Sequence, residues 1–389
     1  MKLKKYIYGV ALGVLALTYT SCYNADKEFP DFDGGTKAYF AYQNPIRTLV
    51  LGNDIYDNSL DNAHKCRIWA TMGGAYGGRD AVVSVIIDEE LCNNLYFLDD
   101  GGYENAKVLP LPHDYYNYDE VKNASINYNG DSRGYLEIQF TDKFFQDVKS
   151  VDTTYVIPVR MTGVTGIDAL LSGEANKAGA IRQNANDWSI LPKDYVLYCV
   201  RFMNPWQGKY IRRGVDVVTE AGKEPATYVR KDFSLYNSDI PHYSQMDPSN
   251  PVNQYDEVCG ITTKTLNEAI FPVSFKTSGA SISCNLILKF DANGKCTITT
   301  DDENVTATGN GEFITKGTER SEYKDYQWGS VEGQPVQRDI LRLQYNVNFA
   351  EKNIQVATND TLVVQTREAN KREWFKYRYN DQPVVLPGN

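Results

Sequence analysis

The chain has 389 residues, with 50 acidic side chains against 40 lysines and arginines, and a net charge of −10 at pH 7. Its basic residues are scattered, which argues against nucleic acid as a partner, because neutralising a phosphate backbone takes a basic stripe. The same balance argues against polyanionic glycans as the main ligand. The apolar content of 42% is ample for buried cores, and the 28 tyrosines favour strands, since aromatic side chains suit a pleated, half-buried surface.

The first residues have the pattern of an export signal. Three lysines precede an uncharged run over residues 6–20, and a small residue leads into Cys22. The run is shorter than the roughly 20 apolar residues that span a bilayer, which is typical of a cleaved signal peptide. A cut before a cysteine resembles a bacterial lipoprotein signal, with Tyr19 in place of the usual leucine; the alternative is an ordinary signal peptide that ends near a cysteine. We expect a signal peptide over 1–21, a lipid anchor on Cys22, and a short tether over 22–35.

Short segments with strand character dominate the first half. Strands are expected over 37–43, 46–51, 65–71, 81–88, 106–109, 124–128, 135–140, 154–164 and 195–202, and helices only over 143–148 and 166–171. In the segment 135–140 apolar and polar residues alternate, which is the period of two that a half-buried strand requires. Asn204-Pro205 ends the last strand, because proline cannot donate to a ladder. This spacing predicts an immunoglobulin-like β-sandwich over residues 36–203.

The second half, residues 204–389, repeats this character. Strands are expected over 269–277, 283–290, 296–300, 309–317, 340–349, 361–367 and 375–379. No helix of crossover length separates them, so the sheet should be antiparallel. The number of strands fits a closed, lipocalin-like β-barrel or a second sandwich. The whole chain is therefore expected to be all-β.

The sequence shows little sign of catalysis or metal binding. The three histidines are isolated, and no zinc motif, serine nucleophile elbow or phosphate-binding loop occurs. Asp291-Ala292-Asn293-Gly294 fits a hairpin turn better than a calcium loop. The six cysteines after Cys22 lack metal-ligand spacing and are expected as buried thiols. We expect a non-catalytic protein without metal or cofactor; a glycosidase with an unrecognised carboxylate pair is the alternative.

Several segments share features with one known group of proteins. They are the cysteine at the end of the signal, the opening strand 37–40, the strand 155–159, the junction 204–210, and the late segments 360–362 and 373–375. Together they resemble Bacteroides surface lipoproteins of polysaccharide-utilisation loci. Those proteins pair a C-terminal β-domain with an N-terminal immunoglobulin-like domain, of a type that also precedes chitinase-like endo-N-acetylglucosaminidases. The resemblance implies an outer-membrane, cell-surface lipoprotein that binds a glycan for a neighbouring importer complex.

Aromatic side chains in polar loops are the candidate glycan platforms, because sugar rings stack their C–H faces on aromatic rings and loops carry function. The candidates are Trp328, Tyr326, Tyr243 and Tyr116. Trp206, Tyr210 and Trp374 are expected in cores, whereas Trp69, on the polar side of its strand, should be partly exposed. Aromatic loops also anchor protein interfaces, so a structural or assembly role at the outer membrane is the alternative function.

Overall fold

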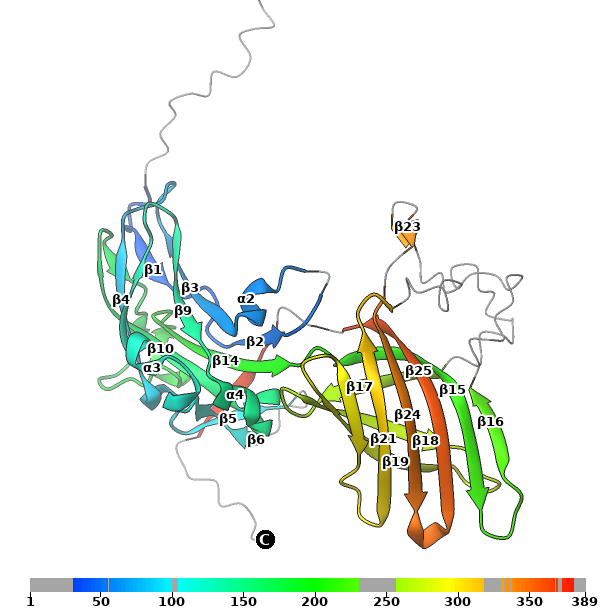
Figure 1. Ribbon diagram of the computed structural model, residues 1–389. Coiled ribbons are helices and arrows are strands. Elements are labelled where there is room, and N and C mark those ends of the chain that lie inside the picture. The colour runs from blue at the N-terminus through cyan, green and yellow to red at the C-terminus, as the bar shows by residue number, and fades with distance from the viewer. Residues whose placement is uncertain are drawn as a thin grey trace, which may run out of the picture.

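A computed structural model describes residues 31–380, apart from residue 55 and the segments 100–103, 231–256, 318–329, 332–333, 336–337, 368 and 370–372. Strands make up most of its regular structure, which confirms the all-β fold class. Figure 1 shows two bodies, a sandwich that begins in blue and a barrel coloured green to orange.

Two sheets form the sandwich. The first has the order β11-β1-β3-β9 and contains β1 (Lys37–Tyr39), β3 (Lys65–Gly73), β9 (Arg133–Gln139) and β11 (Ala169–Leu170). The second has the order β26-β2-β14-β10-β4-β8, with β7 (Leu109–Pro110) beside β10; it contains β2 (Pro45–Val50), β4 (Val82–Ile87), β8 (Asn123–Asn127), β10 (Tyr155–Thr165), β14 (Tyr195–Met203) and β26 (Glu373–Trp374). Both sheets contribute to one apolar core that includes Phe40, Ile68, Val83, Ile138, Ile157 and Phe202.

Alternation along β3 decides which of its side chains reach the surface. Its even-numbered residues from Cys66 to Met72 are buried in the core. The odd-numbered residues therefore lie on the outer face, because successive side chains of a strand point to opposite faces. Antiparallel pairing with β9 sets Trp69 directly opposite Tyr135 on that face.

Short elements surround the two sheets. A small sheet contains β5 (Leu95–Leu98), β6 (Glu104–Lys107) and β27 (Lys376–Tyr379), and β12 (Glu174–Ala175) pairs with β13 (Trp188–Ile190). The described helical turns are α2 (Ser59–Asn62), α3 (Tyr118–Val121), α4 (Asp142–Gln146), η1 (Glu89–Cys92), η2 (His113–Tyr115), η3 (Val148–Val151), η4 (Ala185–Asp187) and η10 (Ala350–Lys352). None of these helices is long and apolar enough to cross a bilayer.

The two helices expected from the sequence have different outcomes. The helix expected over 143–148 forms as α4. The segment 166–171 is instead extended: Gly166 has a φ of 82°, and β11 pairs in parallel with β1. A tertiary contact thus overrides the local helical preference there.

The second body is an antiparallel barrel that closes where β15 pairs with β25. Its strands are β15 (Gly208–Glu220), β17 (Glu257–Thr263), β18 (Glu268–Phe275), β19 (Ile282–Phe290), β20 (Lys295–Thr299), β21 (Val305–Ile314), β24 (Ile340–Phe349) and β25 (Ile354–Thr366). β16 (Ala226–Arg230) extends the sheet beside β15, and β22 (Ser330–Val331) pairs with β23 (Gln334–Pro335). The observed architecture is the barrel rather than a second sandwich.

The turn between β19 and β20 confirms the expected hairpin. Asp291 Oδ1 accepts hydrogen bonds from the backbone N–H groups of Asn293 at 2.8 Å and Lys295 at 2.9 Å. Gly294 has a φ of 78°, a conformation that a glycine adopts without a steric penalty. The aspartate is therefore used as a turn-forming acceptor rather than as a calcium ligand.

The barrel interior is filled by its own side chains. The core includes Tyr210, Phe271, Phe275, Leu286, Tyr345 and Leu362. Within it, fully buried Arg212 donates from Nε to Asp360 Oδ2 at 2.9 Å and from Nη2 to Tyr345 Oη at 3.0 Å. Burial by itself would lower the pKa of Arg212, but the Asp360 carboxylate holds that pKa well above its ordinary value. Gly214 leaves space for this pair, since a Cβ there would come within 2.3 Å of the Asp360 side chain.

The end of the chain returns from the barrel to the sandwich. β26 pairs with β2 of the second sandwich sheet and β27 pairs with β5 of the small sheet, so the segment 373–379, which we call the strap, joins these sheets rather than the barrel. The sequence places these residues in the domain 204–389, and the structure differs on this point. Sheet edges accept a strand from any part of the chain, so local patterns do not name the partner.

The six described cysteines are all free and buried, which confirms the expected thiols. Burial raises the pKa of each to about 12. At neutral pH these thiols are protonated and therefore poor nucleophiles.

Candidate functional site

A cleft of about 430 Å³ opens on the sandwich at the seam between the two sheets. We call it the aromatic cleft; its lining includes Tyr42, Arg47, Arg67, Trp69, Thr71, Arg133, Tyr198, Glu373 and Trp374. Three of its rings are exposed, with 44% of Trp69, 52% of Trp374 and 61% of Tyr42 accessible to solvent. Single exposed aromatic residues are common, but a group of them around one cleft is typical of a binding surface.

The exposed rings form two pairs. The centroids of Trp69 and Tyr135 lie 4.9 Å apart, as expected for residues directly opposite on antiparallel strands. The centroids of Tyr42 and Trp374 lie 5.6 Å apart and join the loop before β2 to the strap. Such tilted contacts fix the rings against their neighbours and leave part of each ring open to solvent.

The cleft exists because β1 leaves β3 early. β1 pairs with β3 only from Thr71 to Gly73, so the described chain places no strand beside β3 at Arg67 and Trp69 on that side. Tyr198 Oη donates to the Arg67 carbonyl at 3.3 Å from across the gap. The edge of a strand thus contributes backbone donors and acceptors to one wall of the cleft.

The loop that carries Tyr42 is held from both sides. The Gln43 carbonyl accepts a hydrogen bond from the N–H of Leu197 at 2.7 Å. The Asn44 carbonyl accepts from the N–H of Phe375 at 3.1 Å, and the Asn44 amide donates to the Phe375 carbonyl. The strap is therefore part of the wall, and the rings of Tyr42 and Trp374 are positioned together.

Guanidinium groups stand beside the rings. The Arg67 guanidinium carbon lies 4.2 Å from the Tyr135 centroid, and that of Arg133 lies 4.9 Å from the Trp69 centroid. Arg67 Nε also lies 3.2 Å from Glu137 Oε2. A hydrogen bond from Lys65, helped by Arg67, holds the pKa of Glu137 below its ordinary value, so this carboxylate stays ionised. Cation–π contacts of this kind hold a guanidinium near the face of a ring.

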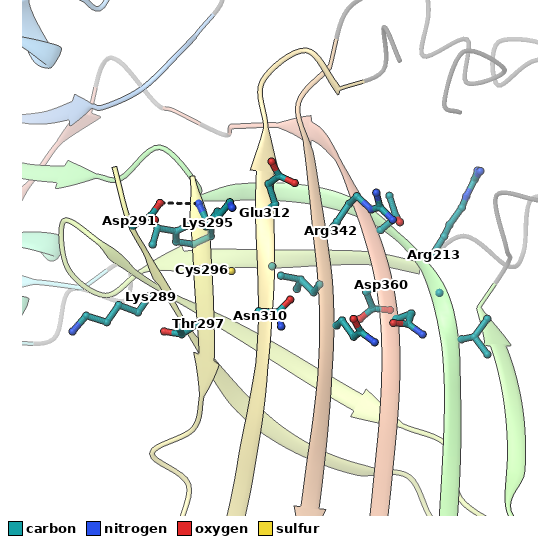
Figure 2. A pocket seen from close by; sticks show the side chains of 18 residues that line it. Arg213, Lys289, Asp291, Lys295, Cys296, Thr297, Asn310, Glu312, Arg342 and Asp360 are labelled. Atoms are coloured by element: carbon teal, nitrogen blue, oxygen red, sulfur yellow. Dashed lines mark hydrogen bonds between the residues drawn. The ribbon is translucent and has the colours of Figure 1, made fainter. Parts of the chain in front are cut away.

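A second and larger hollow, about 1030 Å³, lies on the barrel. Figure 2 shows the side chains of this barrel hollow, among them Arg213, Lys295, Glu312 and Arg342. Strand register places Thr297, Asn310, Gln344 and Asn359 in one row, and Lys295, Glu312 and Arg342 in the next. Its described lining includes one aromatic ring, that of Phe290, which is buried. The barrel hollow suits hydrogen bonds and ion pairs but exposes no described ring for stacking.

Both bodies match known protein families. Residues 205–368, which contain the barrel, match the family described as a domain of unknown function, DUF5627. Residues 32–168 match a family described as an N-terminal domain. A solved structure of a Bacteroides ovatus protein of unknown function is 35% identical, covers 90% of this chain and 100% of its own, and superposes with a TM-score of 0.74. The chain belongs to the family of that protein.

The other comparisons add little to this family assignment. A multidomain protein including DUF1735 from Bacteroides ovatus is 11% identical, over 87% of this chain and 99% of its own, with a TM-score of 0.39. No curated protein matches. The solved family member comes from the genus that the sequence resemblance names.

Of the residues predicted for glycan binding, one lies in the described part of this family member. Tyr116 is 4% exposed, forms a bridge with Phe140, and belongs to the sandwich core. Burial raises the pKa of its hydroxyl, and its ring is not available to a ligand, which corrects the prediction for this residue. Trp328, Tyr326, Tyr243 and the lipidation residue Cys22 lie outside the described residues.

The other aromatic predictions give a mixed result. Trp206 and Tyr210 are buried, as expected, and Trp69 is partly exposed, also as expected. The prediction that Trp374 lies in a core is wrong. Trp374 pairs with Pro45 of β2 and its side chain is exposed, whereas the side chain of the next residue, Phe375, is buried. Tyr42, Arg133 and Trp374 are the cleft residues that sequence reasoning missed. Their shared signal is an aromatic or cationic side chain on the polar side of a short strand or loop.

Within the described residues, no three histidine, cysteine or acidic side chains are grouped so that they could hold a metal ion. The rings, hydroxyls and guanidinium groups that line the aromatic cleft can take part in stacking, hydrogen bonding and ion pairing.

Proposed function

We propose that this family member is a non-catalytic glycan-binding protein whose binding site is the aromatic cleft. The observation that carries the proposal is the group of exposed rings around one concave site, Tyr42, Trp69 and Trp374. Pyranose rings present apolar C–H faces that stack on such rings, and small-ligand sites combine apolar walls with a few polar groups. A volume of about 430 Å³ suits a short stretch of an oligosaccharide rather than a whole polymer.

The polar groups of the cleft support the same ligand. Hydroxyl-bearing side chains are present at Thr71 and Tyr198, and the edge of β3 beside Trp69 offers backbone groups. Sugar hydroxyls both donate and accept, so a wall with both kinds of partner suits them. The barrel hollow supplies hydrogen bonds over a larger area but lacks an exposed described ring, and we therefore assign the glycan to the cleft.

A glycan-array screen of the detergent-solubilised full chain tests this function. Trp69→Ala and Trp374→Ala should each weaken binding by about 30-fold, the loss of about 2 kcal/mol expected for an aromatic hot spot. Tyr76→Ala is the matched control, because Tyr76 is 73% exposed and lies outside the cleft lining. Binding that survives both tryptophan substitutions would remove the cleft from the proposal, and an array without any bound glycan would overturn the function.

We also propose that acyl chains on Cys22 hold the protein at the outer surface of the outer membrane, beside an importer complex. The support is the signal-like sequence of residues 1–21 and the cysteine that follows it. Cells fed a labelled fatty acid should label the wild-type chain, whereas Cys22→Ser should be unlabelled and released from membranes. Labelling that persists in Cys22→Ser would contradict the anchor.

The alternative function, assembly with another outer-membrane protein, would use the same rings, since aromatic residues also anchor protein interfaces. A stoichiometric partner that co-purifies without sugar, and is lost in Trp374→Ala, would favour that function. Sugar release from a glycan by the purified chain would instead favour a glycosidase.

A further inference from the structure

We propose that the aromatic cleft selects an oligosaccharide that carries a single carboxylated sugar, such as a terminal uronic acid, and that Arg133 binds the carboxylate. This inference rests on the proposed glycan binding and adds the charge of the ligand. It assigns Arg133 as the residue that determines specificity, and the rings as the residues that supply general affinity.

The first observation is the charge balance of the cleft lining. Its charged side chains are Arg47, Arg67, Arg133 and Glu373. Three of them have a partner of opposite charge within 4 Å: Arg47 with Asp61, Arg67 with Glu137, and Glu373 with Arg201. Arg133 forms no ion pair with any residue in the described part of the chain, and its contact there is with the Trp69 ring. The cleft therefore holds one positive charge that a ligand can neutralise.

The second observation is how Arg133 is held. Its guanidinium lies over the Trp69 ring, with 4.9 Å between the guanidinium carbon and the ring centroid, and its side chain is exposed. A guanidinium held over a ring still has N–H groups at its rim that can donate to a ligand. Because the guanidinium is already oriented, less conformational entropy is lost when a carboxylate binds than for a free side chain. An arginine rim matches a carboxylate in a two-point hydrogen-bonded pair, which lysine does not reproduce.

The third observation is the position of Arg133 relative to the stacking rings. On β9 it lies opposite Thr71, two pairs along from Trp69 and Tyr135 and on the same face of the sheet. The guanidinium covers part of the Trp69 ring, so a pyranose that contacts the exposed remainder of that ring would lie next to Arg133. The carboxylate of a uronic acid projects from the rim of the sugar ring, which directs it along the same surface.

The charge of the whole molecule restricts the ligand to one or few carboxylates. With a net charge of −10, the chain repels a polyanion at long range. A single carboxylate is repelled only weakly and can form a charge-assisted pair with Arg133. An oligosaccharide that is otherwise neutral therefore fits the cleft better than a polyanion does.

The test compares each uronate-terminated oligosaccharide with its carboxyl-reduced, neutral counterpart on the full chain in detergent. We expect the wild-type chain to bind the acidic form about tenfold more tightly, a difference of about 1.4 kcal/mol, because a charge-assisted hydrogen bond forms only with the acidic form. Arg133→Gln should reduce the ratio of the two affinities from about ten to about one, because the affinity for the acidic form falls more than that for the neutral form, and should leave the thermal midpoint unchanged. Arg133→Lys should restore only part of the preference for the acidic form, and raising the salt concentration should reduce the wild-type preference.

Arg342→Gln in the barrel hollow is the matched control, because it removes an exposed arginine from the other site. A preference that survives in Arg133→Gln, or that is lost in Arg342→Gln, would overturn this inference. Equal wild-type binding of acidic and neutral forms would also overturn it while the glycan-binding function stands. Failure of the wild-type chain to bind either form would overturn the function itself. A sugar that carries one sulfate in place of the carboxylate and binds as tightly as the uronate would overturn the assignment of a carboxylate ligand.

Discussion

The sandwich and the barrel manage their sheet edges in different ways. In the barrel, β15 pairs with β25 along most of its length, so the sheet closes on itself. The side chains of Arg212 and Asp360 form an ion pair in the interior of this closed sheet. The sandwich stays open at the seam between its sheets, where β1 leaves β3 and the strap fills only part of the edge. An open sheet edge leaves backbone groups and neighbouring rings accessible to a ligand, whereas a closed barrel has no such edge. This explains why the smaller of the two hollows is the better candidate site.

The largest expected effect on stability comes from a substitution in the barrel. Asp360→Ala should lower the free energy of unfolding by about 3–5 kcal/mol, because it leaves the Arg212 charge buried without its carboxylate. Urea denaturation measures the loss, with Asn359→Ala, an exposed neighbour on the outer face, as the control. A loss under about 1 kcal/mol would mean that the barrel core tolerates the unpaired charge.

In the sandwich, glycan affinity should depend on a residue that does not line the aromatic cleft. Phe375 is 5% exposed and meets Phe97 with 5.0 Å between the ring centroids, so Phe375→Ala should detach the strap and displace Trp374. Glycan affinity should fall by about 30-fold, as in Trp374→Ala, and the double variant should be no weaker. Exposed Lys376→Ala is the control. Additive losses in the double variant would contradict a shared mechanism.

A substitution at the junction between the sandwich and the barrel should cause a smaller loss of stability. Arg367 donates to the carbonyls of Leu51 at 3.1 Å, Asn204 at 2.7 Å and Gln207 at 2.7 Å, and a lysine cannot make all three bonds. Arg367→Lys should lower stability by about 1–3 kcal/mol and separate the melting of sandwich and barrel into two calorimetric transitions.

The control for this junction is Arg338→Lys. Arg338 donates to the carbonyls of Val364 and Gln365 within the barrel, so its replacement should lower stability without separating the transitions. Two transitions in both variants would show that the barrel bonds, rather than the junction, couple the bodies.

The smallest expected effect is a pH dependence at the end of β15. Glu220 accepts hydrogen bonds from the Ser278 hydroxyl and backbone N–H, both at 2.7 Å, and these with Lys223 lower its pKa to about 2 from an ordinary 4.5. A depressed pKa stabilises the fold above the unfolded value, and this contribution disappears as the pH falls through the folded value. The melting-temperature difference between wild type and Glu220→Gln should therefore shrink from pH 4.5 towards pH 2. A difference that stays constant with pH would assign the effect to packing.

Local patterns in the sequence predicted many of the strands, the turn at Asp291 and the buried thiols, but they predicted neither β15, which closes the barrel, nor β17. These features depend on neighbours within a few residues: an alternating strand such as β9 has one apolar side, and Asp-x-Asn-Gly closes a turn by its own hydrogen bonds. The all-β class follows from the same local information. Tyr116 shows the limit of local information, because a tyrosine in a polar cluster is still buried when its backbone forms an isolated bridge with Phe140.

The aromatic cleft depends on contacts between distant parts of the chain. Tyr42, Trp69 and Trp374 lie far apart in the sequence, and they meet because the strap pairs with β2 while β1 leaves β3 open. The sequence Trp374-Phe375 does not say which ring is buried; the register of the strap against β2 places the phenylalanine inside. The packing of the whole chain determines which strands pair and in which register. A periodicity of two residues within one strand identifies neither the partner strand nor the register.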